Sequence, residues 1–597
     1  MLSEQGTIGE ELVMQFAVQL SRILSLCIWL SATSVAAQEP PEGAPIELAQ
    51  PSGGEQPHPF GHYGASVDLD NDVDLHFTKN HLFRSWSETQ TFNVRRPVSY
   101  DHLSDRVEPA SFFVADAQES GSRVVQGKGL SGVAGNGPCL GCEQERPGFA
   151  RRLFNAYVDE FQGTPQAAGT EPASLRRAMP SPWDSPPYPS SEYQGYPLIG
   201  VPPATKEWPL MKALSGTAIG DAMKANGIKA YGWINGSYNR STAKNTNQPI
   251  SYWIVPNSIV LDQAIFRVER EVDTTQTDHI DFGFRSTHLY GIDYRYMTAG
   301  GWLSDQLLKR NQLYGYDPTE QYLDMYVPWV AQGLILRVGR WVATPDIETQ
   351  FAPDNYMATH TLQFTFDTYT QTGMMATVML NKQWTVQAAI HSGTDMAPWY
   401  KGAVATGMAG IRWVSLDNND SVYLVLNNIN NAKFRHFEVD GQPAGHDNFN
   451  YVVGTWQHRF NQEIHTKLAG IYLWQRDGVV GGTPILGPNR SFSDVGSRGA
   501  LLPGMSLAYG VLNYTMFQVA PRDYFTLRNE WWRDERGMRS GFASHYSTHA
   551  VGFSHQFNDV VMIRPEVGYY RSYTVPAFSR SRDGDMVMGG LDVTFRY

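Results

Sequence analysis

Sixteen segments of alternating polar and apolar residues fill the C-terminal part of the chain, and this repetition constrains the fold more than any other feature. From residue 229 onward the segments follow one another to the last residue. A period of two places successive side chains on opposite faces of a β-strand. The predicted strands are 229–240, 256–270, 279–296, 319–328, 332–342, 372–380, 383–393, 406–416, 420–430, 449–460, 463–476, 505–519, 522–535, 546–557, 559–572 and 586–597.

Connections between these segments alternate between short and long. Tight turns follow every second strand, at 329–331, 381–382, 417–419, 461–462, 520–521 and 558–559. Long connections lie between them, such as 297–318, 343–371, 431–448 and 477–504. Outer-membrane barrels have short periplasmic turns, long outer loops and both termini on the periplasmic side. We therefore predict an all-β fold, a transmembrane up-and-down antiparallel β-barrel of about sixteen strands.

The two faces of the predicted strands differ in the way a membrane barrel requires. In the last segment Leu591, Val593 and Phe595 alternate with Asp592 and Arg596. A two-sheet sandwich also alternates, so the position of the aromatic residues decides between them. Belts of aromatic residues at the two membrane interfaces are typical of a barrel in lipid, so such a placement favours a membrane barrel over a sandwich. Tryptophans on the apolar face near strand ends are Trp384, Trp413, Trp456, Trp474 and Trp531.

The N-terminus has the features of a secretory signal. An apolar run at 23–30 follows Arg22 and precedes small residues. This run is too short to span a bilayer, and Val35 and Ala37 occupy the −3 and −1 positions of a cleavage site before Gln38. We predict a signal peptide over 1–37, with Met14 as an alternative start because the residues before it are acidic. The predicted location is the outer membrane.

Proline divides the mature chain into two parts. Residues 38–228 hold 21 of the 35 prolines, and residues 229–597 hold 14. We predict a Pro-rich extension over 38–228 that lies in the periplasm, or partly in the lumen, before a barrel over 229–597. Apolar residues at near-helical spacing predict one helix at 209–225, which Gly227 ends.

The sequence offers little for metal, cofactor or catalytic chemistry. Cys139 and Cys142 form a single CxxC without the further ligands of zinc or c-type haem, so we expect a local disulfide or an unimportant thiol pair. The acidic stretch 68–74 lacks the Gly and Glu of a calcium loop, and a strand with an acidic face is the favoured alternative. No GxSxG, Walker or HExxH motif occurs. We expect no cofactor, no metal and no enzymatic activity.

Several stretches carry a family resemblance. They are GIKAYGWI at 227–234, HLYGIDYRY at 288–296, MYVP at 325–328, GLILRVGRW at 333–341 and TG at 372–373. Over about residues 208–597 the chain resembles the outer-membrane β-barrel porins of the second, OmpL-like group. This resemblance implies a pore, and it implies no defined catalytic or ligand-binding residues.

We predict a water-filled lumen that passes small hydrophilic solutes or ions by passive diffusion. Expected partners are outer-membrane lipid and the barrel-insertion machinery, and a homo-oligomer such as a trimer is left open. The net charge of −12 argues against a nucleic-acid partner. The main alternative is a structural or adhesive barrel whose extension binds the cell envelope or a partner. A 22-stranded energised receptor and a soluble exported β-protein are further alternatives.

The third long connection, 343–371, is acidic and contains no Lys or Arg. In sixteen-stranded general porins, which this barrel resembles in architecture, the third loop folds into the lumen and narrows it. Acids on that loop and arginines on the wall would create a transverse field, with a weak preference for cations. An outward loop whose acids keep it soluble is the alternative. The predicted constriction residues are Asp346, Glu348, Asp354, Asp367, Arg267, Arg285, Arg337, Arg412, Arg528 and Arg564.

Overall fold

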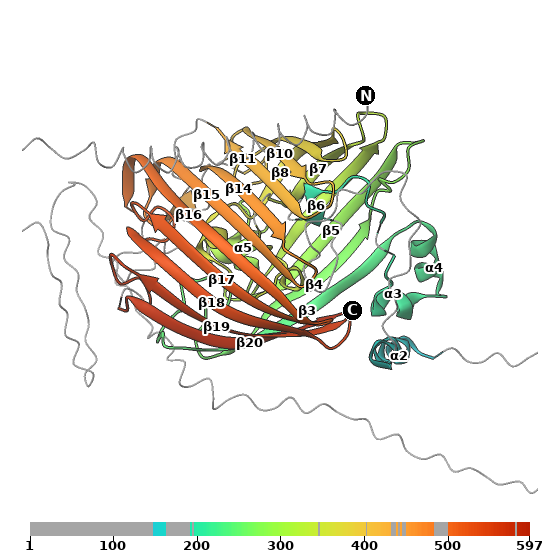
Figure 1. The fold of residues 1–597 in the computed structure, drawn as a ribbon, viewed down its shortest axis with the longest axis horizontal. Helices are drawn as coiled ribbons and strands as arrows, with labels where there is room; N and C mark the ends of the chain where they lie inside the picture. Colours follow the sequence, from blue (N-terminus) through green and yellow to red (C-terminus); the bar gives the residue numbers. More distant parts are fainter. Residues whose placement is uncertain are drawn as a thin grey trace, which may run out of the picture. The chain divides into compact units, whose positions relative to one another are not determined.

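Sixteen β-strands in the C-terminal part of the chain close into one barrel (Figure 1). The computed structural model describes residues 147–162, 192–193, 196–203, 205–343, 347–400, 403–430, 438–439, 442–443, 449–482, 500–579 and 582–597. The chain divides into two units, 1–134 and 135–597, and the first lies wholly outside the described residues. Also outside them lie the predicted signal peptide, most of the extension 38–228, the acidic stretch 68–74, and Cys139 and Cys142.

Each predicted strand is present, and each pairs antiparallel with its neighbours around the ring, so the predicted fold is confirmed. In chain order the strands are β3 (Lys229–Ser241), β4 (Ile259–Arg270), β5 (Asp281–Gly291), β6 (Gly315–Val327), β7 (Leu334–Val342), β8 (Thr370–Met379), β9 (Trp384–His391), β10 (Thr406–Val414), β11 (Asp420–Ile429), β14 (Asn450–Arg459), β15 (Ile464–Val479), β16 (Leu501–Ala520), β17 (Asp523–Asp534), β18 (Ser544–Gln556), β19 (Val561–Ser572) and β20 (Asp585–Arg596).

The barrel closes where the last strand pairs with the first. Val593 of β20 lies opposite Gly236 of β3, and Phe595 lies opposite Ile234. Closure removes the open edge that a sheet in lipid could not satisfy. The sixteen-strand ring also excludes the 22-stranded receptor.

The remaining described elements are short. Two small hairpins pair β1 (Glu192–Tyr193) with β2 (Tyr196–Pro197) and β12 (Glu438–Val439) with β13 (Gln442–Pro443). The helices are α2 (Phe149–Gln162), α3 (Pro209–Leu214), α4 (Ala218–Ala225), α5 (Tyr294–Met297), α6 (Asp305–Leu308), the 3₁₀ turn η2 (Ala352–Asp354) and α7 (Leu362–Phe366). Within the described part of the chain, none of the helices has the length and apolar character needed to cross a membrane.

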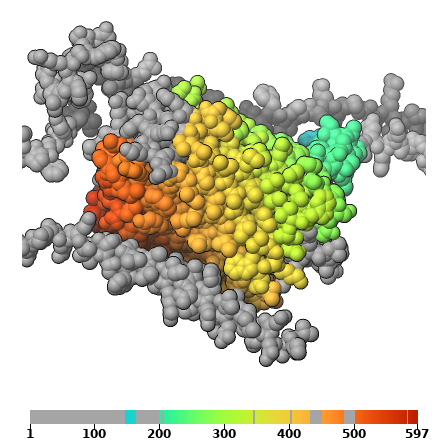
Figure 2. Space-filling model, turned by 90° about the horizontal axis from the view of Figure 1, so that it is seen from above, coloured from blue at the N-terminus to red at the C-terminus, as the bar shows by residue number. Residues whose placement is uncertain are grey.

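The inside of the barrel holds the buried charged side chains together with apolar clusters, whereas many side chains on its outer face are apolar and exposed. On β17 the inward Arg528 and Glu530 are buried, but the outward Val511 of β16 and Val567 of β19 are 49% and 50% exposed. Figure 2 shows one side of the barrel, where the residues coloured yellow-green to orange form a continuous outer surface. Exposing such an apolar band to water is unfavourable in free energy, whereas exposing it to lipid is not. The distribution therefore matches a membrane barrel and not a soluble exported β-protein.

The predicted tryptophans lie on the outer face near both ends of the wall. Trp384 of β9 and Trp413 of β10 lie opposite each other near the short turns, and Trp456 of β14 is near the same end. Trp474 of β15 and Trp531 of β17 lie toward the long loops. This placement agrees with aromatic belts at two membrane interfaces.

The predicted helix at 209–225 is wrong in one respect, because it is two helices. Between α3 and α4, Gly216 adopts the left-handed region with φ 71°. Thr217 then accepts a hydrogen bond from the Gly220 N–H at 3.1 Å and caps a new helix. Gly227, with φ 66°, follows the end of α4, as predicted.

The predicted strand 279–296 is too long at its C-terminal end. Strand β5 ends at Gly291, and α5 turns the chain inward. Its Tyr296 is buried and stacks on Tyr252, with 4.4 Å between ring centroids. Contacts inside the lumen therefore override the alternating pattern at this point.

Candidate functional site

The third long loop, which we call L3 (343–369), crosses the inside of the barrel. It joins β7 to β8, and its described residues 347–369 are all buried except Thr349 and Asp354, which are half-buried. L3 hydrogen-bonds to β17, β18 and β19, which lie on the opposite side of the ring. Of the two alternatives for this loop, the structure has the inward one.

Strand β17 supplies a carboxylate that holds the start of α7. Glu530 accepts hydrogen bonds from the backbone N–H groups of Leu362 at 3.0 Å and Gln363 at 2.7 Å. It also accepts one from the Thr548 hydroxyl at 3.0 Å. The first N–H groups of a helix have no partner within the helix, so the wall carboxylate satisfies two donors inside the barrel.

Strand β19 supplies a second carboxylate to L3. Glu566 accepts hydrogen bonds from the N–H groups of Ala358 at 2.9 Å and Thr359 at 3.1 Å, and from the Thr359 hydroxyl. Arg528 of β17 donates to the Thr359 carbonyl and hydroxyl oxygens. Its guanidinium lies 3.6 Å from the Glu566 carboxylate. Thr359 is therefore held by two strands of the far wall.

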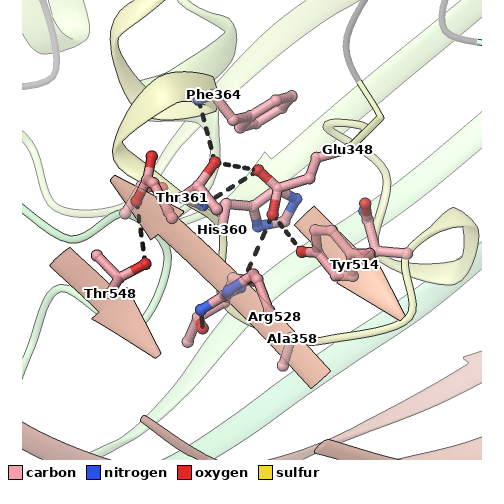
Figure 3. Close-up of polar contacts among 12 residues, drawn as sticks. Glu348, Ala358, His360, Thr361, Phe364, Tyr514, Arg528 and Thr548 are labelled. Carbon is pink, nitrogen blue, oxygen red and sulfur yellow. Dashed lines mark hydrogen bonds and ion pairs between the residues drawn. The ribbon is translucent and has the colours of Figure 1, made fainter. Parts of the chain in front are cut away.

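L3 brings its own carboxylate to the same arginine, as Figure 3 shows. Glu348 lies 3.7 Å from Arg528 and accepts hydrogen bonds from the Thr361 N–H at 3.1 Å and from the Tyr514 hydroxyl. Burial raises the pKa of Glu348, whereas Arg528 and the hydrogen bonds from Thr361 and Tyr514 oppose that rise. Arg528 thus stands between one loop carboxylate and one wall carboxylate.

Arg564 of β19 holds the part of L3 near η2. Its guanidinium donates to the carbonyl oxygens of Ala352 at 2.7 Å and Asn355 at 2.6 Å, and it pairs with Asp592 of β20. Burial raises the pKa of Asp354 in the same turn, and nearby arginines oppose the rise. A charged wall group therefore fixes the loop backbone here as well.

An aromatic stack joins L3 to the first two long loops. Tyr252 of loop 242–258 stacks on His360 at 3.7 Å and on Tyr296 at 4.4 Å between ring centroids. The His360 Nε2 lies 2.7 Å from the Thr349 carbonyl oxygen. Burial lowers the pKa of His360 well below its usual value, so the ring is neutral and its Nε2 carries the donated proton.

All six predicted arginines are buried among the interior side chains. Besides Arg528 and Arg564, three of them pair with wall carboxylates: Arg267 with Glu320 at 2.8 Å, Arg285 with Glu269 at 2.6 Å and Arg337 with Asp324 at 2.7 Å. Arg412 donates to the Ser421 hydroxyl at 3.3 Å. The structure thus brings together Glu348 and Arg528 from the predicted set, and it gives several other arginines partners within the wall.

Two of the predicted loop acids remain. Asp367 follows α7 and is buried beside the Arg539 region, where Arg539 donates to the Phe366 carbonyl oxygen at 2.8 Å. Asp346 lies outside the described residues. In the described part of the chain, no cluster of three or more His, Cys, Asp or Glu side chains is placed to hold a metal.

Two anchoring residues, Glu530 and Glu566, are absent from the predicted set. Each follows a predicted arginine by two residues, Glu530 after Arg528 and Glu566 after Arg564. Residues two apart on a strand share a face, so the same parity that selected the arginines also selects these acids. Four of their five hydrogen bonds from the loop come from backbone N–H groups, which no side-chain pattern reveals.

Comparisons with known proteins bear on the barrel region. The family model BBP2, described as beta-barrel porin-2, OmpL-like, matches residues 227–597. A sequence comparison with curated proteins finds no match.

Among solved structures, similarity extends to several outer-membrane proteins. OprB of Pseudomonas putida is 11% identical with a TM-score of 0.41, over 66% of this chain and 99% of that chain. The outer membrane channel DcaP of Acinetobacter baumannii is 10% identical with a TM-score of 0.39, over 62% and 97%. An anion-selective porin from Comamonas acidovorans is 7% identical with a TM-score of 0.39, over 62% and 99%.

Proposed function

This chain belongs to the beta-barrel porin-2, OmpL-like family, and on that basis we propose how its pore selects what it passes. The protein is an outer-membrane porin through which small hydrophilic solutes or ions diffuse passively. Family and fold point to a channel rather than an enzyme.

L3 and the wall that it meets form the restriction of the lumen. The observation that carries this proposal is the crossing of L3 to β17, β18 and β19, where wall charges hold its backbone. Fixed charges at a narrow point act on every permeating ion. The proposed restriction comprises Asp346, Glu348, Asp354 and Asp367 on the loop and Arg267, Arg285, Arg337, Arg412, Arg528 and Arg564 on the wall.

The restriction gives a weak preference for cations. The buried ionisable side chains in the described part of the chain comprise fourteen acids and eleven bases, a formal excess of three acids that is smaller where burial keeps a carboxyl protonated, as at Asp395. A small acidic excess attracts cations and repels anions without excluding either. The acids are Asp262, Glu269, Asp281, Asp293, Asp317, Glu320, Asp324, Glu348, Asp367, Asp395, Glu530, Asp534, Glu566 and Asp592, and the bases are Arg267, Arg285, Arg295, Arg337, Arg340, Arg412, Lys467, Arg528, Arg539, Arg564 and Arg596.

Reversal potentials in a salt gradient across a planar bilayer test this proposal. We expect stepwise conductance and a reversal potential of the sign that cation preference gives. The double variant Glu348→Gln with Asp354→Asn should move that potential toward zero, because it removes two loop carboxylates. Asp278→Asn is the matched control, because Asp278 is exposed in the turn 271–280, away from L3.

Three results would contradict the proposal in different ways. No conductance at any voltage would contradict the channel itself. Anion preference in the unmodified protein would contradict the predicted sign. An unchanged reversal potential in the double variant would show that these L3 carboxylates do not set the ion selectivity.

We also propose how the protein reaches and occupies the outer membrane. Its predicted signal peptide, 1–37, directs export with cleavage before Gln38, and the extension 38–228 lies largely in the periplasm. Outer-membrane lipid covers the apolar band, and the barrel-insertion machinery recognises the last strand. Assembly into a homo-oligomer, with a trimer as the candidate, is testable by cross-linking in detergent. Mass spectrometry of the mature N-terminus tests the cleavage site.

A further inference from the structure

A short segment before the barrel lies inside its short-turn end. We call residues 198–203 the strap. Leu198 and Ile199 of the strap are buried, with 6% and 2% of their surface exposed. Although the strap precedes the first barrel strand by many residues, it therefore packs like part of the interior.

Ile199 packs against inward side chains of four wall strands. It forms one buried apolar cluster with Tyr326 of β6, Ile335 of β7, Met379 of β8 and Val414 of β10. These four wall residues lie at the strand ends next to the short turns 328–333, 380–383 and 415–419. The inner face also carries other apolar clusters, such as the one with Val453, Ile471 and Leu473, and the strap covers the cluster described here.

One turn residue fixes the strap backbone. The Gly200 N–H donates to the Thr274 hydroxyl oxygen at 2.9 Å, and that hydroxyl donates to the Val201 carbonyl oxygen at 3.1 Å. The Thr274 carbonyl in turn accepts a hydrogen bond from Tyr326 at 3.1 Å. Tyr326 thus packs with the strap in the apolar cluster and also hydrogen-bonds to the turn that holds the strap.

The strap lies over charged groups of the lumen wall. A cavity of about 40 Å³ separates it from that wall and has room for little more than water. On one side the cavity is lined by Leu198, Val201, Pro202 and Pro203, and on the other by wall residues including Glu269, Arg285, Asp324 and Arg337. Two of these charges, Arg285 and Arg337, belong to the proposed restriction, so the strap lies beside the path of permeating ions.

We propose that the periplasmic mouth is a binding groove for extended chain, that the strap fills it in cis, and that this occupancy restricts the pore. The pore then has two restrictions in series, L3 within the barrel and the strap at the mouth. Pro202 and Pro203 have no N–H to pair with a strand, so the strap is held by its buried side chains and by Thr274 rather than by a ladder. A segment held in this way can leave without breaking the barrel.

This inference rests on the proposed porin function, and single-channel conductance of the full chain tests both. The double variant Leu198→Asp with Ile199→Asp places charges in the apolar cluster and should expel the strap. We expect conductance to rise roughly twofold or more, because conduction follows the open cross-section. Ile219→Asp is the control, since Ile219 of α4 is 69% exposed and should leave conductance unchanged.

Thr274→Val provides a second variant that leaves the strap sequence intact. It removes the hydroxyl that bonds Gly200 and Val201, and it should raise conductance in the same direction by a smaller factor. Heat-modifiable migration in SDS confirms a folded barrel for each variant. If the unmodified protein conducts and neither variant exceeds it, the strap inference is overturned while the porin function stands. If no form conducts, the porin function fails and the inference fails with it.

Discussion

Glu530 on β17 accepts a hydrogen bond of 2.7 Å from the backbone N–H of Gln363, which belongs to a loop that leaves the barrel wall on the opposite side of the ring. The same carboxylate accepts the N–H of Leu362 at 3.0 Å. Hydrogen bonds to a charged acceptor contribute about 1.5–3 kcal/mol each. L3 is therefore fixed across the lumen by charge, and not only by its connection to β7 and β8.

We expect Glu530→Gln to loosen L3 without unfolding the barrel. A glutamine keeps one acceptor oxygen, but it loses the charge and brings an NH₂ group toward two N–H donors. Single-channel recordings should show larger current fluctuations and a higher mean conductance than those of the unmodified protein. Glu463→Gln, on the exposed turn 460–463, should change neither quantity. Unaltered noise in the Glu530 variant would show that this carboxylate does not hold the loop.

Removing the Arg528 guanidinium should have a larger effect than removing any one carboxylate beside it. In Arg528→Met the two carboxylates of Glu348 and Glu566 lose the cation between them, and breaking a buried pair in this way costs about 3–5 kcal/mol. We expect stronger cation preference in reversal potentials and a lower midpoint of urea unfolding.

The double variant Arg528→Met with Glu348→Gln checks the cause of this effect. Because it removes one of the two carboxylates that lose the arginine, it should recover part of the lost stability and reduce the added cation preference. Additive losses in stability would contradict a direct coupling between Arg528 and Glu348. Arg476→Met is a control for charge alone, since the Arg476 side chain is 55% exposed.

The wall of the barrel can be predicted from sequence because its information is local. Alternation with a period of two and tight turns between strands place the sixteen barrel strands within a few residues of their observed bounds. The pattern does not depend on which strand lies opposite. It fails at α5, where Tyr296 leaves the alternation because it packs on Tyr252 inside the lumen.

The site can be predicted only in part because its contacts are not local. The alternation of strand faces predicted that Arg528 points into the lumen. The position of 343–371 as the third long loop predicted that Glu348 lies near it. The partners of Glu530 and Glu566 are N–H groups of L3 that lie 168 and 208 residues away in sequence. Backbone donors carry no residue signature, so the anchoring of L3 follows only from the structure. The strap escapes prediction for the same reason, since its burial depends on a contact with Thr274 in a distant turn.

The apolar band predicts that the free-energy cost of a charged substitution on the outer face depends on its depth in the bilayer. Val567 lies in the middle of β19 and is 50% exposed on the outer face, whereas Val519 is 62% exposed near the end of β16. An arginine at the midplane of a membrane barrel costs about 2–4 kcal/mol and one near the interface about 0–1. Val567→Arg should therefore lower the free energy of unfolding in urea and lipid bilayers far more than Val519→Arg. Equal losses at the two positions would contradict the assigned membrane band.

A buried carboxylate beside L3 makes stability depend on pH. Asp395, in the loop 392–405, accepts hydrogen bonds from the N–H groups of Thr370 at 2.7 Å and Tyr369 at 3.2 Å. Burial raises the pKa of Asp395 to about 7, although these hydrogen bonds and the arginines Arg340 and Arg539 act against the rise. In the unfolded chain the pKa of an aspartate is about 4.

The sign of this effect follows from the two pKa values. Between about pH 4 and 7 the folded protein holds a proton on Asp395 that the unfolded chain has lost, so stability falls as the pH rises through that window. The upper limit is about 4 kcal/mol for a shift of this size. We expect Asp395→Asn, which is neutral at every pH, to abolish that fall: relative to the variant, the unmodified protein should lose urea resistance between pH 5 and pH 8. Asp305→Asn, whose side chain is 61% exposed, should leave the pH dependence unchanged. A parallel pH dependence in the Asp395 variant and the unmodified protein would contradict the assignment, because the other buried groups titrate equally in both.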